Sequence, residues 1–301
     1  MKTGKIFVIG DVMLDKYRYC TTRENPEHKS APCYSVRKKD YKPGGAGNVA
    51  ANLASLGADF KLISVVGSDH YSRVLEDILL DFKVSCEFIK DSKRQTIVKE
   101  RIFVNDQYKC RIDDEEVEYI EENHVQEILS KIKDASLILI SDYRKGMISS
   151  RLMDELRTQN IPIVIDAKPE HIDFYRNVFL VKPNSKEVRE MTGIEDEILA
   201  GEALMKKLNS NILLTRGPEG ISYFGLNGKR YDFPAEKRKV IDVTGAGDTA
   251  IAAFSHFIMK GKRLEECICL ANIAAAISVS YPGCHQITEK EIFDLSDSES
   301  R

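Results

Sequence analysis

Short apolar runs alternate with longer stretches of helical period along most of this chain. The first run, residues 6–9, reads Ile-Phe-Val-Ile and stops at Gly10-Asp11, a pattern typical of a strand buried on both faces. Comparable runs occupy residues 60–66, 137–141, 161–166, 178–181 and 212–215. Apolar residues recur three and four positions apart in residues 48–56, 72–82, 120–132, 149–159, 185–192 and 199–208. Strands that alternate with helices predict an α/β fold whose mostly parallel sheet carries helices on both faces.

Two stretches depart from this alternation. Residues 17–42 are polar and basic without a helical period, and residues 95–113 alternate polar with β-branched and aromatic residues around Asn105-Asp106. The second pattern is typical of a β-hairpin. We expect both excursions to form a small second sheet over the strand ends, where open α/β proteins bind ligands. The pattern thus predicts one domain over residues 1–301, with lid segments at approximately 16–42 and 93–114.

Composition excludes several classes of protein. Apolar residues make up 43% and charged residues 30%, so the chain is neither disordered nor of low complexity. A net charge of -3 provides no basic field for nucleic acid or for an anionic membrane. The seven cysteines lack paired CxxC spacing and the six histidines form no ligand set, which argues against disulfide and zinc frameworks. Because we find no secretion signal and no apolar run that could span a bilayer, we expect a cytoplasmic protein.

The stretch 242–248 (DVTGAGD) carries the clearest chemical signal. A Gly-Ala-Gly turn that opens a helix leaves backbone N–H groups unpaired at the positive end of the helix dipole, which attracts phosphate. A carboxylate in the same turn would compete with the anion unless it had a task there, so we interpret Asp248 as a general base for phosphoryl transfer. The amides of Gly245, Ala246 and Gly247 would stabilise the transferred group. The alternative is that Asp248 only caps the helix.

This stretch resembles the C-terminal signature of the ribokinase family, the pfkB-type carbohydrate kinases. Residues 44–50 (GGAGNVA), with Gly57 and Gly67, resemble the N-terminal signature of the same family, and the resemblance covers nearly the whole chain. It implies a ribokinase-like sugar kinase that uses ATP with Mg²⁺. It also implies that Asp248 is the base and that the amides of residues 245–247 form the anion hole.

Further positions resemble the nucleotide-binding elements of that family. Asn184 and Glu187 resemble its Asn-x-x-Glu motif, which implies that they position Mg²⁺ and phosphate through water; taken alone they would indicate a helix N-terminus. Residues 215–220 (TRGPEG) resemble its nucleotide loop, for which an ordinary tight turn is the alternative. The resemblance assigns ATP contacts to Asn184, Glu187, Thr215, Arg216, Gly217, Gly220, Thr244 and Asn272.

Polar residues near the two glycine-rich stretches are candidate sugar ligands. Asp15 stands where the family keeps an acidic residue for sugar hydroxyls, and Asp11 precedes it on the same loop. A carboxylate accepts two hydrogen bonds without donating any, and Asn48 adds an amide that both donates and accepts. Gly44 and Gly45 of the N-terminal signature complete this set. Loop and cap chemistry is the alternative for both aspartates.

Four stretches together resemble one branch of the family, the D-glycero-β-D-manno-heptose 7-phosphate kinases. They are residues 10–15, 42–57, 141–146 and 242–248. This resemblance implies transfer of the ATP γ-phosphoryl group to the anomeric C1 hydroxyl, giving the 1,7-bisphosphate from which ADP-heptose for lipopolysaccharide is made. Many such kinases continue into a nucleotidyltransferase, so for this chain we expect that activity on a separate protein. The family also implies a homodimer through the lid, which would cover exposed strand edges.

A substrate with a phosphate at its far end needs cations about a sugar's length from Asp248. Lys99, Arg101 and Arg111 lie on the predicted lid strands, and Lys99 and Arg101 are two apart and so share one strand face. Lys168, just beyond a strand end, is a further candidate for phosphate or nucleotide. The alternative for each is a solvated surface charge.

Two segments depart from the usual heptose kinase pattern. Residues 24–32 (ENPEHKSAP) replace Ser-Pro-Glu-Ala-Pro in the first lid segment. Residues 281–285 (YPGCH) replace a more usual Lys-Leu-Gly-Thr, near the nucleotide and the monovalent-cation site of the family. Two alternatives therefore stay open: a kinase of another sugar or phosphosugar, and a non-catalytic sugar-binding regulator on the same fold.

Overall fold

The larger of two β-sheets forms the body of the protein. The computed structural model describes residues 4–25, 31–236 and 238–298, and within them this sheet has the strand order β13-β12-β11-β10-β9-β8-β1-β4-β5. Its strands are β1 (Lys5–Gly10), β4 (Phe60–Gly67), β5 (Cys86–Asp91), β8 (Ala135–Ser141), β9 (Ile163–Asp166), β10 (Leu180–Lys182), β11 (Asn211–Thr215), β12 (Ile221–Phe224) and β13 (Arg230–Phe233). All neighbours from β5 to β11 pair in parallel, which confirms the predicted sheet. The antiparallel strands β12 and β13 at one edge are an addition that the apolar pattern did not indicate.

Helices cover both faces of this sheet, as predicted. On one face lie α1 (Ala46–Ser55), α2 (His70–Asp81), α7 (Ala246–Met259), α8 (Leu264–Ser278) and α9 (Glu289–Ser298). On the other lie α3 (Glu122–Lys131), α4 (Ser150–Thr158), α5 (Ser185–Thr192) and α6 (Glu197–Leu208). Two short 3₁₀ helices, η1 (Pro169–Tyr175) and η2 (Gly217–Glu219), follow β9 and β11.

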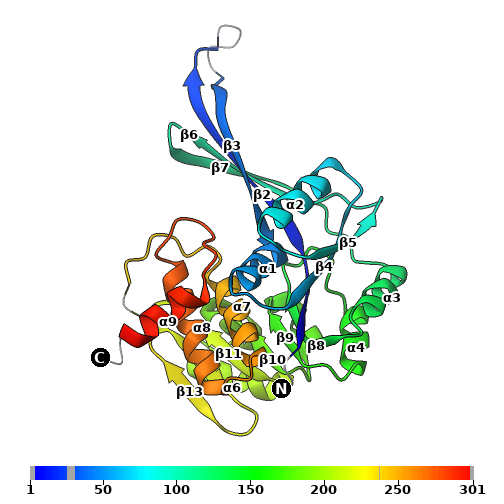
Figure 1. The fold of residues 1–301 in the computed structure, drawn as a ribbon, viewed down its shortest axis with the longest axis vertical. Helices are drawn as coiled ribbons and strands as arrows, with labels where there is room; N and C mark the ends of the chain where they lie inside the picture. Colours follow the sequence, from blue (N-terminus) through cyan, green and yellow to red (C-terminus); the bar gives the residue numbers. More distant parts are fainter. Residues whose placement is uncertain (1–3, 26–30, 237, 299–301) are drawn as a thin grey trace.

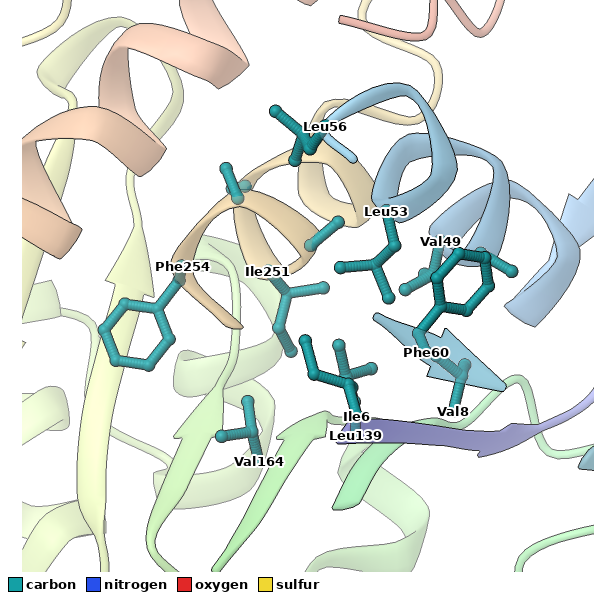
Figure 2. Close-up of a cluster of buried hydrophobic side chains, with 14 of the residues drawn as sticks. Ile6, Val8, Val49, Leu53, Leu56, Phe60, Leu139, Val164, Ile251 and Phe254 are labelled. Carbon is teal, nitrogen blue, oxygen red and sulfur yellow. The ribbon is translucent and has the colours of Figure 1, made fainter. Parts of the chain in front are cut away.

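The two faces of the sheet bury two separate cores. Along β1, Ile6 belongs to the core under α1 and α7, whereas Phe7 belongs to the core under α3 to α6, because successive side chains on a strand point to opposite faces. Figure 2 shows the first core, where Leu53 of α1 and Ile251 of α7 lie over the strands. The packing of α1 against α7 brings the start of both helices to the same edge of the sheet, which positions the candidate site.

The lid is a separate four-stranded sheet with the order β3-β2-β6-β7. Its strands are β2 (Val12–Arg23), β3 (Cys33–Gly45), β6 (Val98–Val104) and β7 (Gln107–Asp114), and Figure 1 shows them projecting from the body. The predicted turn at Asn105-Asp106 is present, with both residues at positive φ (49° and 62°), as a tight hairpin requires. The first lid segment begins earlier than predicted, at Val12, because β2 follows β1 with only Asp11 between them. Residues 26–30, which hold most of the divergent lid segment, lie outside the described residues.

Gly45 joins the lid to the body at the start of α1. Its φ is 59°, in the left-handed region, and a Cβ there would lie 2.3 Å from the backbone oxygen of Asp11. Only glycine fits this junction without moving the backbone. Among the residues that the structure describes, no helix is long and apolar enough to cross a membrane.

Candidate active site

Asp248 lies at the centre of a cluster drawn from three distant parts of the chain. Its Oδ2 accepts a hydrogen bond of 2.7 Å from Asn48 Nδ2 in α1, and its Oδ1 accepts one of 2.8 Å from the Tyr143 hydroxyl. The N-cap of α7 is Gly245, which has no side-chain cap, so Asp248 belongs to the first turn of the helix. The hydrogen bonds found for the carboxylate in the described part of the chain come from Asn48 and Tyr143, so helix capping does not explain its position.

Burial raises the pKa of the Asp248 carboxyl to about 6, and the negative charge of Asp166 acts in the same direction. The hydrogen bonds from Asn48 and Tyr143, together with the charge of Lys182, oppose this rise. Burial and the nearby Asp248 also raise the pKa of Tyr143 well above its ordinary value, so its hydroxyl remains a donor. A carboxyl group with a pKa close to neutrality is suited to accept a proton and release it again.

The turn before α7 requires glycine at Gly245. Its φ is 79°, and a Cβ there would lie 2.8 Å from Asn48 Nδ2 and 3.0 Å from Cys284 Sγ. The Ala246 amide donates a long bond of 3.3 Å to the Val243 oxygen. The amides of residues 245–247 stand at the positive end of the helix dipole, the place predicted for the anion hole, although their contact with an anion stays a prediction.

Asp242 ties this turn to the divergent segment 281–285. Its carboxylate accepts hydrogen bonds from the Thr244 amide and hydroxyl, at 2.9 and 2.7 Å, and from the Gly283 amide at 2.9 Å. Cys284 consequently lies beside Gly245, and burial raises the pKa of its thiol to about 12. The thiol is therefore neutral at ordinary pH, and this segment forms part of the wall of the site.

Asn184 and Glu187 form a reciprocal capping box at the start of α5. Asn184 Oδ1 accepts from the Glu187 amide and Glu187 Oε2 accepts from the Asn184 amide, each at 2.9 Å. Lys168 Nζ lies 2.6 Å from Glu187 Oε1 and 5.5 Å from the centroid of the Tyr143 ring. Burial lowers the pKa of Lys168, but Asp166, Glu187 and Asp248 outweigh it and leave the pKa raised. The helix-start interpretation is thus confirmed for Asn184 and Glu187, and their magnesium role stays a prediction.

The side-chain oxygens that would hold Mg²⁺ belong to Asn184 and Glu187, and they already accept hydrogen bonds within the protein. Among the described residues, no group of three or more His, Cys, Asp or Glu side chains is arranged to hold a metal ion. Mg²⁺ usually keeps several waters and binds through substrate phosphates and one or two carboxylates. The capping box with Lys168 fits that indirect mode, because Glu187 and Asn184 present oxygen atoms while leaving most ligands to phosphate and water.

The predicted nucleotide loop lies beside Asn184. Thr215 donates its amide to the Pro183 oxygen at 3.1 Å, and Arg216 pairs with Glu197 at 3.2 Å and donates to Ser222 Oγ at 3.1 Å. Gly217 and Gly220 have φ values of 55° and 86°, which glycine adopts without strain, so the turn favours glycine at both positions.

Asn272 of α8 binds the segment that follows β13. Its Nδ2 donates a hydrogen bond of 2.7 Å to the oxygen of Pro234, in the segment before the 242–248 stretch. Pro234, Ile241 and Ser280 contribute to the lining of a cavity of about 800 Å³. Asn272 therefore helps to hold one wall of this cavity, and its contact with ATP stays a prediction.

Asp11 holds the loop that follows β8. The side chain is 3% exposed, and its two oxygens accept hydrogen bonds from the amides of Tyr143, Lys145 and Met147 at 2.9 to 3.0 Å. These three bonds fasten the loop that carries Tyr143 toward Asp248. The hydrogen bonds found for its carboxylate go to backbone amides, which supports the loop alternative; a contact of Asp11 with sugar hydroxyls stays a prediction.

Asp15 lies on the lid face that turns toward the site. It pairs with Arg101, and a Cβ at Gly44 would lie 2.6 Å from Asp15 Oδ2, so glycine at that position leaves room for the carboxylate. The charges of Asp248 and Asp15 raise the pKa of the Cys284 thiol further, whereas those of Lys42 and Arg101 oppose the rise.

The predicted lid cations separate into two sets. The register pairs Asp15 with Lys99 and Tyr17 with Arg101, which confirms that Lys99 and Arg101 share a strand face. Lys99 lies 3.4 Å from Asp113 and 3.3 Å from Glu115, and the more exposed Arg111 also pairs with Asp113. Of the three lid cations, only Arg101 reaches a candidate sugar ligand.

Sequence reasoning missed four residues of this site. Tyr143 and Lys42 lie within stretches that were singled out, but nothing in their local pattern marks them as functional. Asp166 and Lys182 each end a short buried strand, and a charged residue at the carboxyl end of an apolar run was the available signal.

Comparison with known proteins gives one family and one fold. The family model described as pfkB family carbohydrate kinase matches residues 3–291. The chain is 35% identical over 303 residues to Bifunctional protein HldE of Azorhizobium caulinodans, covering 95% of this chain and 63% of that protein. It is 32% identical over 300 residues to Bifunctional protein HldE of Pasteurella multocida, covering 97% of this chain and 63% of that protein. The chain thus spans about 63% of the length of these relatives.

Solved structures share the fold at low sequence identity. Escherichia coli phosphofructokinase-2 in complex with fructose-6-phosphate has a TM-score of 0.81 and 17% identity, covering 99% of this chain and 100% of that one. Arabidopsis thaliana ribokinase complexed with ribose and ATP has a TM-score of 0.77 and 20% identity, covering 98% and 99%. The predicted ribokinase-like fold is confirmed.

Proposed function

The chain belongs to the pfkB family of ATP-dependent carbohydrate kinases, and we propose that it phosphorylates the C1 hydroxyl of D-glycero-β-D-manno-heptose 7-phosphate. The observation that carries the proposal is the hydrogen bond between Asn48 and Asp248, which joins the two family signatures in one buried site. The choice of sugar rests on the four stretches that resemble heptose 7-phosphate kinases.

In the proposed reaction, Asp248 accepts the proton of the acceptor hydroxyl as its oxygen attacks the γ-phosphorus of ATP. The bond from that phosphorus to the ADP oxygen breaks, and the amides at the start of α7 stabilise the charge on the transferred group. Asn48 Oδ1 is buried and has no hydrogen-bond partner in the described part of the chain. A buried acceptor in that state favours a donor from the substrate, and a sugar hydroxyl supplies one. Bound Mg²⁺ would neutralise phosphate charge, with Asn184 and Glu187 holding it through water.

Arg101 and Lys42 are the cations we assign to the distal phosphate. Arg101 lies beside Asp15, and both Arg101 and Lys42 lie near the face of the Tyr17 ring, at 5.4 and 5.9 Å from its centroid. An Asp15 carboxylate for sugar hydroxyls next to two cations suits a phosphorylated sugar better than a neutral one. Lys168, in contrast, stands with Glu187 near Asp248 and is assigned to the nucleotide phosphates.

The direct test is an assay of ATP turnover against a panel of sugars and sugar phosphates, with Mg²⁺ and with or without K⁺. We expect the heptose 7-phosphate to give the highest kcat/KM and the product to carry the new phosphate at C1. Clear turnover of another phosphosugar, with none of the heptose 7-phosphate, would replace this substrate by that one. No turnover with any sugar, despite sugar binding, would favour the non-catalytic regulator.

The pH profile tests the state of the base. Because Asp248 must be ionised to accept a proton and its pKa is raised to about 6, kcat/KM is expected to rise as pH increases through about 6 and then level off. Tyr143→Phe removes a hydrogen bond that lowers this pKa. The rise of kcat/KM on the acid side of the profile, the acid limb, is therefore expected to move to higher pH by about one pH unit. Tyr231→Phe, on the edge strand β13 of the large sheet, is the control and should leave the pH dependence unchanged. An unmoved limb in Tyr143→Phe would contradict the assignment of the limb to Asp248.

We also propose that the lid pairs with the lid of a second copy. The outermost lid strands, β3 and β7, carry exposed apolar side chains at Tyr34, Val36, Tyr108 and Ile112. Open strand edges with apolar residues favour association. Light scattering should report a dimer, and a monomer at assay concentrations would rule this out.

A further inference from the structure

Lys182 is a buried ammonium group beside the anion turn that the mechanism above does not use. Its Nζ lies 2.9 Å from Asp166 Oδ1, and the two side chains are 3% and 8% exposed. The two residues are register partners at the ends of β10 and β9, so the sheet itself sets their separation.

The ion pair lies directly against the first turn of α7. A Cβ built at Gly247 would come within 3.1 Å of Lys182 Nζ and 4.0 Å of Asp166 Oδ2. A side chain at position 247 would therefore press on the ammonium, so glycine there leaves space for the cation as well as for an anion. Lys182 also acts electrostatically on Asp248, which places its charge close to the reacting groups.

Stability alone gives little reason for this arrangement. Removing two charges from water is expensive, and hydrophobic residues of similar volume often replace such pairs without loss. An ammonium group carries three N–H donors, and Asp166 is its ion-pair partner among the described residues. The group can therefore hold a phosphate oxygen while keeping a bond to Asp166.

We propose that Lys182 is a catalytic residue that binds the γ-phosphoryl group of ATP from the side of Gly247, with Asp166 as the residue that positions its ammonium. This proposal rests on the function proposed above. Lys182 then supplies a charge fixed by the protein where negative charge develops during transfer, in addition to the amides of the turn. Lys168 is paired instead with Glu187 of α5, 2.6 Å away.

The test compares two nucleotides that differ only by the terminal phosphate. Binding of ADP and of the non-hydrolysable analogue AMP-PNP, each with Mg²⁺, is measured by calorimetry on the full chain. In Lys182→Met we expect the preference for AMP-PNP over ADP to fall by about tenfold and kcat to fall by about 10². Lys182→Arg keeps the charge and should retain most of that preference. Lys61→Met is the control. It removes a lysine of β4 that pairs with Glu87 of β5, and it should bind both nucleotides like the wild type.

The outcomes separate this proposal from the kinase assignment. An unchanged AMP-PNP preference in a folded Lys182→Met would overturn the role of Lys182 while leaving the kinase intact. Equal weakening of both nucleotides would also overturn it, because that result indicates a structural role. If the wild type bound neither nucleotide, the proposed function itself would fail. If Lys182→Met loses cooperative melting, Lys182→Gln replaces it, because glutamine keeps a polar contact for Asp166. The preference for AMP-PNP over ADP is then measured in Lys182→Gln and tests the proposal in the same way.

Discussion

Asp248→Asn is expected to lower kcat by roughly 10² or more while nucleotide binding changes little. The substitution keeps the size of the side chain but removes its capacity to accept a proton at ordinary pH. The neutral amide can still accept one of the two hydrogen bonds that Asn48 and Tyr143 now donate, so the fold should survive. Steady-state kinetics with ATP and the sugar phosphate, together with AMP-PNP calorimetry, measure both expectations.

Two comparisons make this result interpretable. Asp154→Asn, at an exposed position of α4 that pairs with Arg157, should match the wild type in rate and melting temperature. Asp248→Ala removes the acceptor altogether and should be at least as impaired as Asp248→Asn. Activity of Asp248→Asn within a few fold of wild type would mean that another group takes the proton.

Arg101→Met is expected to lower kcat/KM for the sugar phosphate by about 10², which corresponds to about 3 kcal/mol for losing one charged partner of a desolvated phosphate. The loss should appear mainly in the KM for the sugar phosphate. It should be much smaller for the same sugar without its distal phosphate, because that substrate offers Arg101 no anion. Kinetics with the phosphorylated and unphosphorylated sugars measure the difference.

The same pair of substrates separates phosphate binding from a structural effect. Arg101 also pairs with Asp15, so a variant that only disturbed Asp15 would lose activity toward both sugars equally. Lys42→Met should show the same phosphate-specific loss as Arg101→Met. Arg37→Met is the control, since Arg37 lies near the exposed end of the lid and donates to Thr21 at 3.0 Å. If activity toward both sugars fell equally, Arg101 would not bind the distal phosphate.

Local pattern was sufficient for the elements of the body. Runs such as residues 6–9 and 137–141 are short, apolar and bounded by polar residues, and they appear as β1 and β8 because burial on both faces demands such a composition. The turn before α7 could also be predicted from the sequence, because the glycines on both sides of Ala246 and the helical pattern that follows are local features of the chain. The antiparallel edge of β12 and β13 escaped this reasoning, since an exposed edge strand such as β13 carries no strong apolar period.

Residue chemistry alone did not decide which side chains meet. Asp11 and Asp15 are both aspartates after the first strand, yet Asp11 is occupied by backbone amides and Asp15 faces Arg101 on the lid. Lys99 and Arg101 share a strand face, as their spacing predicted, but their ionic partners differ. The difference comes from the register of β7 and from the loop after β7, which bring Asp113 and Glu115 to Lys99.

The amino-acid order therefore indicated the α/β architecture, the lid strands and Asp248 as the candidate base, because each is marked by a local pattern of residues. The tertiary structure decided the environment of that carboxylate. Asn48 lies 200 positions from Asp248 and Tyr143 lies 105. The packing of α1 against α7 brings Asn48 to Asp248, and the loop after β8, which is bonded to Asp11, brings Tyr143. Burial in the assembled protein raises the pKa of Asp248 and directs the Asp11 carboxylate to the loop amides. The strand register places Lys182 beside Asp166.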